Sequence, residues 1–130
     1  MFTLMTKFAI FVAIAIMAGC AGSTAKIATL SEAELQKESS VNLCNAYHFQ
    51  KVKSAKDELI RRKEFSDKTW ISIENGAIFI GMSEVGLVCA MGGPIRVNLT
   101  VTKEGESKQF VYGSRTYVYT QNGFITSWQK

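Results

Sequence analysis

The pattern of apolar and polar positions divides the chain into three stretches. Residues 8–17 form an uninterrupted apolar run, residues 31–91 carry short apolar stripes separated by polar residues, and from residue 95 onwards apolar residues occupy alternate positions. A helix that buries one face repeats its apolar residues every three to four positions, whereas a half-buried strand repeats them every two. The sequence therefore predicts helices first and strands afterwards.

Short helices are predicted in residues 31–91 from polar residues that can cap their first turns. Ser31 and Glu34 have the spacing of a capping box, in which each side chain accepts a hydrogen bond from the other residue's backbone N–H. The last helix is expected to end before Gly92-Gly93-Pro94. The predicted N-caps are Ser31, Ser40, Ser54, Ser66 and Ser83.

The alternation of Ile95, Val97, Leu99 and Val101 with polar residues predicts a half-buried strand. Further strands are expected at 107–112, 116–120 and 124–128, and Asn122-Gly123 is a strong signal for a tight hairpin between the last two. The predicted fold class is α+β, with short N-terminal helices packed on a C-terminal three- to four-stranded antiparallel meander in a two-layer sandwich.

The apolar run near the N-terminus indicates export. Lys7 precedes the run and small residues follow it, as in a secretory signal peptide. The run is too short for a transmembrane helix, which needs roughly 20 apolar residues. We expect residues 1–19 to be a signal peptide, 20–30 a lipidated cysteine and tether, and 31–130 a single α+β domain, helical in 31–91 and with its sheet in 94–129.

Ala18-Gly19-Cys20 resembles the lipobox of bacterial lipoproteins. The resemblance implies that the thiol of Cys20 receives a lipid and that Cys20 becomes the first residue of the mature protein. Ala21 in place of an aspartate implies delivery to the outer membrane, with the domain facing the periplasm. The alternative is an ordinary signal cleavage site beside an incidental cysteine, which would give a protein secreted to the periplasm.

The two remaining cysteines, Cys44 and Cys89, are expected to form a disulfide, because an even pair in an oxidising compartment is most simply bonded. The competing interpretation is a metal or nucleophile site, because Cys44 and His48 are four residues apart and would share a helix face. His48 is the only histidine in the chain. The sequence therefore offers few further ligands, and no metal or cofactor is predicted.

The charged residues exclude one class of partner. A formal net charge of +4 is too modest to indicate nucleic-acid binding. A basic segment near residues 51–63 is either a solvated helix face or a contact for anionic lipid headgroups, which attract basic residues close to a membrane. The residues that would make this lipid contact are Lys51, Lys53, Arg61, Arg62 and Lys63.

Aromatic residues at alternate positions of the last strands can line one face of the sheet. We expect this face to be core, because large aromatic side chains are costly to leave in water. The alternative is an exposed apolar patch that binds a partner. The residues concerned are Phe110, Tyr112, Tyr117 and Tyr119, followed by Phe124 and Trp128, with Val111, Val118 and Ile125 on the opposite face.

Several short motifs in residues 77–128 resemble the SmpA/OmlA, or BamE-like, family of outer-membrane lipoproteins. They are Gly81-Met82-Ser83, Gly93-Pro94, the segment 109–112 and the segment 122–126. The resemblance implies a fold and a role in outer-membrane assembly or maintenance. It assigns no site residue. The N-terminal half is more similar to other small proteobacterial lipoproteins that pair Cys-x-Ala-Tyr with Gly-Met-Ser.

No catalytic constellation is evident, because the single histidine is not placed near any serine and the glycines match no phosphate-binding loop. The sequence therefore predicts a non-enzymatic, membrane-anchored envelope lipoprotein that binds an envelope protein or acts as a scaffold. The alternative is a small ligand-binding or inhibitor-like periplasmic module. A concave pocket with convergent polar groups would favour the ligand, and a flat apolar patch with a polar rim would favour the protein.

Overall fold

The structure, a computed structural model, describes residues 23–130. The predicted signal peptide and Cys20 lie outside the described residues. Among the helices of residues 23–130, none is long and apolar enough to cross a membrane.

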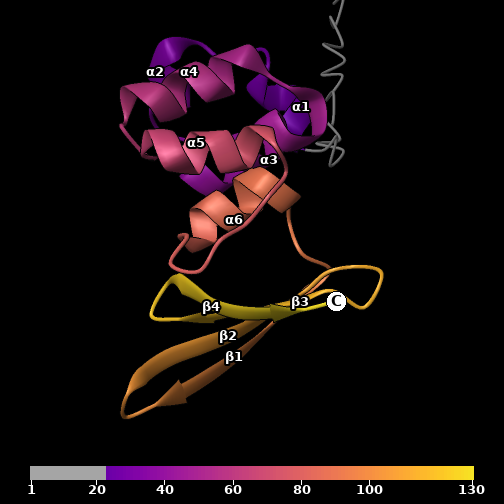
Figure 1. Cartoon of the computed structure of the whole chain (residues 1–130). Helices are drawn as coiled ribbons and strands as arrows, with labels where there is room; N and C mark the ends of the chain where they lie inside the picture. The colour runs from indigo at the N-terminus through magenta and orange to yellow at the C-terminus, as the bar shows by residue number, and fades with distance from the viewer. Residues whose placement is uncertain (1–22) are drawn as a thin grey trace, which may run out of the picture.

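Helices and strands follow one another in the predicted order, and the α+β class is confirmed (Figure 1). The four strands form one antiparallel meander in the order β1-β2-β3-β4. The helices are α1 (Ser23–Ile27), α2 (Glu32–Leu35), α3 (Ser40–Gln50), α4 (Lys53–Arg61), α5 (Asp67–Glu74) and α6 (Glu84–Met91), and the strands are β1 (Arg96–Thr102), β2 (Gly105–Val111), β3 (Tyr117–Gln121) and β4 (Phe124–Gln129).

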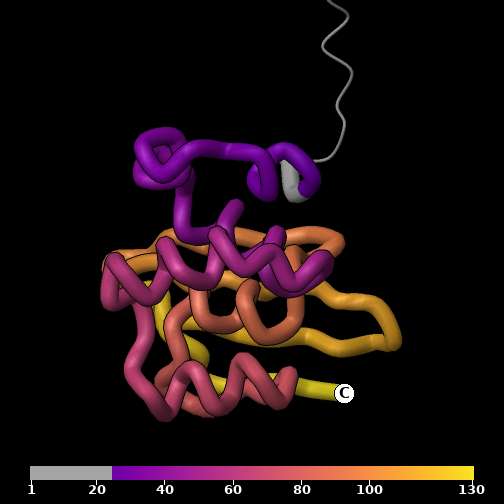
Figure 2. The backbone as a smooth tube through the Cα atoms, turned by 90° about the horizontal axis from the view of Figure 1, so that it is seen from above, coloured from indigo at the N-terminus to yellow at the C-terminus, as the bar shows by residue number. Residues whose placement is uncertain are grey.

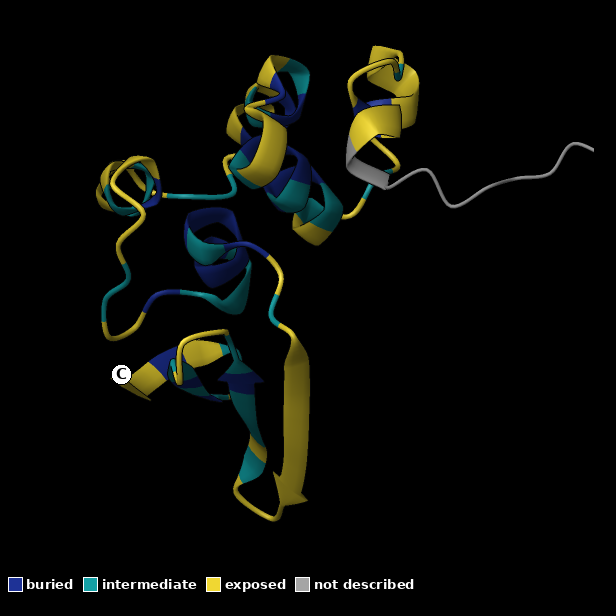
Figure 3. Ribbon diagram, turned by 90° about the vertical axis from the view of Figure 1, so that its right-hand side faces the viewer, coloured by how far each residue is buried: buried dark blue, intermediate teal, exposed yellow. Residues whose placement is uncertain are grey.

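Helix α6 lies between the sheet and the other helices (Figures 1 and 3). Its residues from Gly86 to Ala90 are all buried. A helix that is apolar all round needs cover on every side, and α6 obtains it from the sheet on one side and from α3 and α5 on the other. Within the helical layer, α6 is the helix that lies directly over the strands.

The Cys44–Cys89 disulfide joins α3 to α6, with the two Cα atoms 4.4 Å apart, and confirms the predicted pairing. Both cysteines are almost completely buried. The surrounding core contains Leu43, Leu59 and Leu87, none of which is exposed. The disulfide therefore lies in the middle of the helical core and ties the first half of the chain to the helix that carries the sheet.

Serine caps begin four of the helices, and two predicted starts are shifted. The capping box at Ser31 and Glu34 is confirmed, as are the caps at Ser66 and Ser83. The cap of α3 is Ser39, whose side chain accepts from the N–H of Asn42, so the predicted cap at Ser40 is wrong by one residue. Helix α4 begins after Val52 with no side-chain cap, so the start predicted at Ser54 is also wrong. Tertiary contacts evidently replace a cap there, because Val52, Ala55 and Leu59 are buried on one side of α4.

The segment predicted to be a tether is partly helical. Residues 23–27 form α1, and the side chain of Ile27 is buried in the core. Burial of one large aliphatic side chain is enough to hold such a short helix against α3. Helices α1 and α2 and the C-terminal strand lie at opposite sides of the molecule (Figure 2).

The two edges of the sheet differ. The outer edge of β4 is covered by residues 81–84, through hydrogen bonds from Gly81 N–H to the carbonyl of Ile125 (2.8 Å) and from Ile125 N–H to the carbonyl of Met82 (2.8 Å). The tight hairpin at Asn122-Gly123 is confirmed, with φ angles of 48° and 89° as a primed turn requires. At the other edge, β1 pairs with β2 only, and no other strand in residues 23–130 pairs with it.

Candidate functional site

Strand β1 is the largest uncovered apolar feature of the sheet. All seven of its residues are exposed, although its alternation predicted a half-buried strand (Figure 3). The side chains of Val97, Leu99 and Val101 are 42%, 54% and 66% exposed, and Ile95, just before the strand, is 76% exposed. The prediction of a strand is confirmed, and the prediction of its burial is wrong.

The width of α6 explains why β1 remains uncovered. A helix with its side chains is about 10 Å across, whereas four strands spaced by about 4.8 Å extend further than one such helix can cover. The buried strand residues accordingly lie in β2, β3 and β4, where Phe110, Val118 and Ile125 are 6%, 0% and 1% exposed. Periodicity identifies the apolar face of β1, but only the position of α6 decides whether that face is covered.

An apolar groove of about 300 Å³ adjoins the start of β1. Val41 at the start of α3 is 41% exposed, and Val85 and Val88 of α6 line the groove opposite Val97. Pro94 and Phe110 also line it. The uncovered face of β1 therefore continues into a groove that reaches α3 and α6. We call Ile95, Val97, Leu99, Val101 and this groove the edge-strand surface.

One ion pair lies beside the groove and fixes α6 to the sheet. Glu84, the first residue of α6, accepts hydrogen bonds from Lys108 Nζ (2.9 Å) and Thr120 Oγ1 (2.7 Å). The hydrogen bond to Glu84 raises the pKa of Lys108. Glu84 and Lys108 lie at the rim of the apolar surface. Because they bind each other, neither is an unpaired charge there.

The predicted single aromatic face does not form. Phe110 is paired with Val118, and Val111 with Tyr117, so Phe110 and Tyr117 point to opposite faces of the sheet. Phe110 and Tyr112 face α6: Phe110 is buried, and the Tyr112 hydroxyl donates to the carbonyl of Gly92 (2.9 Å). Burial raises the pKa of Tyr112. Tyr117 and Tyr119 lie on the face that no helix covers.

That outer face of the sheet carries a row of polar side chains that bind one another. Asn98 Nδ2 donates to Gln109 Oε1 (2.8 Å), and Gln109 Nε2 donates to the Tyr119 hydroxyl (3.3 Å). The Tyr119 hydroxyl donates in turn to Gln129 Oε1 (3.1 Å). A row of uncharged side chains linked across four strands stabilises the sheet and needs no further partner to satisfy it.

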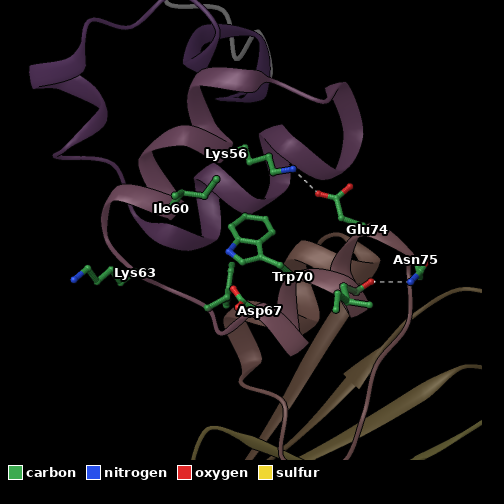
Figure 4. A pocket seen from close by; sticks show the side chains of 9 residues that line it. Lys56, Ile60, Lys63, Asp67, Trp70, Glu74 and Asn75 are labelled. Carbon is green, nitrogen blue, oxygen red and sulfur yellow. Dashed lines mark hydrogen bonds and ion pairs between the residues drawn. The ribbon is translucent and has the colours of Figure 1, made fainter.

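A second open groove, of about 580 Å³, lies between α4 and α5 (Figure 4). Trp70 lies below Ile60 and Lys56 in this view, and the side chain of Lys63 points away from the groove. Ile60 and Ile71 are 50% and 64% exposed. The groove therefore offers apolar surface at its sides.

Two of the charged groups that line this α4/α5 groove, Lys56 and Glu74, bind each other. Glu74 Oε1 accepts from Lys56 Nζ (2.7 Å) and from the Tyr47 hydroxyl (2.6 Å). The hydrogen bond from Lys56 lowers the pKa of Glu74, while the same bond raises the pKa of Lys56. Burial, and then the bond to Glu74, raise the pKa of Tyr47. Lys56 and Glu74 are consequently engaged with each other and are not free to orient a small ligand.

Most of the basic residues predicted to contact lipid have a partner in the protein, although Lys53 and Arg61 are largely exposed. Lys53 pairs with Asp57 (2.6 Å), and Lys51 lies over the ring of Tyr47, 4.7 Å from its centroid. Arg61 and Arg62 both bind Glu58. Lys63 lies after α4 with φ of 54° and is exposed.

Glu58 is the one buried carboxylate of this region, with 6% of its side chain exposed. Arg61 Nη2 and Arg62 Nε lie 2.7 and 2.9 Å from Glu58 Oε1, and Arg62 also donates to the carbonyls of Leu35 (2.9 Å) and Glu38 (2.7 Å). Arg62 therefore links α4 to the chain between α2 and α3. The hydrogen bonds from Arg61, and then from Arg62, lower the pKa of Glu58 to about 2.

We expect Glu58→Gln to destabilise the protein by about 2 kcal/mol at neutral pH, because it leaves a charged Arg62 without its carboxylate. Since the folded pKa of Glu58 is lowered from 4.5 to about 2, its stabilising effect is complete above pH 4.5 and is lost as the pH falls towards 2. The free energy of unfolding of the parent should thus approach that of the variant in acid. Denaturant melts between pH 2 and 7 measure this. Asp57→Asn is the control, because its ion pair with Lys53 is exposed and should matter little. If the free energies of unfolding of the parent and Glu58→Gln differ by the same amount down to pH 2, the prediction is contradicted.

The structure decides between the two interpretations of Cys44. Its sulfur is bonded to Cys89, so it is neither a thiolate ligand nor a nucleophile in this state. His48 lies beside the disulfide, with Nδ1 3.3 Å from the carbonyl oxygen of Cys89. Within residues 23–130, no three His, Cys, Asp or Glu side chains gather in a way that could hold a metal ion.

Sequence reasoning missed the edge-strand surface, although it identified every strand residue of it. The signal was present in the lengths of the elements. Helix α6, which directly precedes the strands, has only eight residues, whereas four strands follow it. The α4/α5 groove had no signal in the sequence, because its walls come from two helices whose relative placement depends on tertiary packing.

Comparisons of the chain with protein-family models, with curated proteins and with solved structures found no match. These comparisons therefore add nothing for or against the resemblance to BamE-like lipoproteins.

Proposed function

We propose that this chain is a non-enzymatic envelope lipoprotein, anchored through Cys20 in the outer membrane and facing the periplasm, that binds protein through the edge-strand surface. The observation that carries the proposal is the exposure of Val97, Leu99 and Val101 on an edge strand whose outer side pairs with no strand in residues 23–130. Exposed edges of this kind bind another strand, because their backbone N–H and C=O groups lack partners.

Two further features support protein over a small ligand. The edge-strand surface is an apolar patch with the Glu84–Lys108 pair at its rim, which is the arrangement of a protein interface. In the α4/α5 groove, Lys56 and Glu74 bind each other instead of pointing into an empty space. A role in outer-membrane assembly or maintenance rests on the family resemblance alone.

The anchor is proposed from the lipobox-like end of the signal segment. Several acyl chains on one cysteine bind a membrane far more tightly than a single chain does, because each buried CH₂ contributes about 0.8 kcal/mol. Such an anchor would hold the edge-strand surface near other envelope proteins. The basic residues near α4 are a weaker candidate for membrane contact, because Arg61 and Arg62 already bind the buried carboxylate of Glu58.

We expect a photoreactive amino acid at Val101 to crosslink the protein to a partner in intact cells, and Cys20→Ser to move the protein from the membrane fraction to the soluble fraction. The matched control carries the same photoreactive residue at Ile71, which is as exposed (64% against 66%) but lies on α5. Equal crosslinking from both positions would contradict binding through β1. A Cys20→Ser variant that stays in the membrane pellet would contradict the anchor.

A further inference from the structure

The residues of β1 are self-complementary about Leu99. The order Val97-Asn98-Leu99-Thr100-Val101 places valine at both ends, a polar residue inside each valine, and leucine at the centre. If two copies of this strand run antiparallel with Leu99 opposite its own copy, Val97 lies opposite Val101 and Asn98 lies opposite Thr100. Every apolar side chain then meets an apolar one on the same face.

This arrangement satisfies what stabilises a pair of strands. Directly opposite side chains interact most strongly, and aliphatic pairs and polar pairs are both favourable, whereas like charges are not. Here Arg96 lies opposite Thr102, so no like charges face each other. The unpaired backbone groups of each edge would hydrogen-bond with those of the other copy.

The strand also lacks the features by which proteins prevent such pairing. Edge strands are normally protected by proline, by inward-pointing charges, by bulges or by a covering segment. The five residues from Val97 to Val101 include no proline and no charge, and the register with β2 runs from Arg96 to Thr102 without a shift. The opposite edge of the same sheet is covered by residues 81–84. Protection is therefore present at β4 and missing at β1.

The helices do not obstruct a second copy. Helix α6 lies over the other strands, and β1 is exposed along its whole length (Figure 3). A two-fold axis perpendicular to the sheet at Leu99 keeps the helices of both copies on the same side. The two α6 grooves then flank the paired strands.

We propose that the partner bound by the edge-strand surface is a second copy of this chain, and that two β1 strands pair antiparallel across a two-fold axis at Leu99. The two four-stranded sheets become one continuous sheet. This inference rests on the proposed function, because it names the protein that β1 binds. Seven residues from each copy make a smaller contact than the roughly 20–30 residues a side of a standard interface, so the association is weak in dilute solution. Anchoring both copies in one membrane raises their effective concentration.

Charge substitutions on the two-fold axis test the pairing. Two epitope-tagged copies of the full chain are expressed together and chemically crosslinked in intact membranes. The membranes are then solubilised, and one tag is captured while the other is measured. Parent copies should be captured together. Leu99→Glu in both copies, or Leu99→Lys in both, should reduce joint capture at least about tenfold, because like charges then face each other at the axis. One Leu99→Glu copy with one Leu99→Lys copy should recover it.

The recovered pair also shows that both variants fold. Ile71→Glu in both copies is the matched control and should be captured like the parent, because Ile71 is exposed on α5, away from β1. Parent copies that are not captured together, glutamate variants that are captured as well as the parent, or mixed copies that fail to recover would each overturn the pairing. A Val101 crosslink to a different polypeptide, without joint capture of parent copies, would overturn self-pairing while leaving the proposed protein-binding function standing. Loss of both signals would overturn both.

Discussion

Replacing both Cys44 and Cys89 by alanine should lower the free energy of unfolding by about 4 kcal/mol, because the disulfide closes a loop of 45 residues in the unfolded chain. For a domain of this size the melting temperature should fall by roughly 15 °C or more. Removing the two sulfur atoms from a buried position adds a smaller loss of packing in the same direction.

Thermal and denaturant melts of the exported protein measure this effect, and alkylation followed by mass spectrometry shows whether the parent cysteines are bonded. The control is the parent with its disulfide reduced and its thiols left in place, because reduction removes the crosslink but not the core atoms. The reduced parent should lose most of the stability that the double variant loses. A double variant that melts within a few degrees of the parent contradicts the prediction.

The second large effect is a difference in stability between variants on the two faces of the sheet. Phe110→Ala should destabilise the protein by about 3 kcal/mol, because it removes a buried ring between β2 and α6 and leaves a cavity. Tyr119→Ala should cost less than about 1 kcal/mol, because Tyr119 lies on the outer face, where its hydroxyl binds Gln109 and Gln129.

These two variants are matched, since each truncates one aromatic side chain in neighbouring strands. Urea unfolding monitored by circular dichroism gives both values under one condition. A core that contained both residues would make the two variants similarly unstable and would abolish this difference. A Tyr119→Ala variant as unstable as Phe110→Ala would mean that both residues face the core, contrary to the register of β2 and β3.

The error over the aromatic face has a specific cause in the hairpin between β2 and β3. Phe110 and Tyr119 are nine residues apart, and whether they share a face depends on the number of residues in the turn between them. The observed pairing of Phe110 with Val118 places all odd-numbered residues of β3 on the outer face. The bulge between Tyr119 and Thr120 then lets Ile125 and Trp128, three residues apart, both face α6. A sequence without a strong turn signal, such as Gly113-Ser114-Arg115, leaves this choice open.

The helix boundaries illustrate a second kind of difference. Ser31, Ser66 and Ser83 were predicted correctly because each has a side chain that accepts from the N–H three residues later, which is a local interaction. Helix α4 starts at Lys53 without such a bond, because burial of Val52, Ala55 and Leu59 replaces it. Ile27 holds α1 in the same way, through contacts with residues that are distant in the sequence.

The sequence by itself determined the features that depend on neighbours along the chain: the order of helices and strands, most caps, the Asn122-Gly123 hairpin and the pairing of the two cysteines of the domain. The tertiary structure decided which of the apolar residues are covered. Alternation marks Val97, Leu99 and Val101 as one face of a strand, but their exposure follows from the width of a single helix lying over the other strands. Burial depends on what is placed above a surface, and that placement is set by packing among elements far apart in the chain.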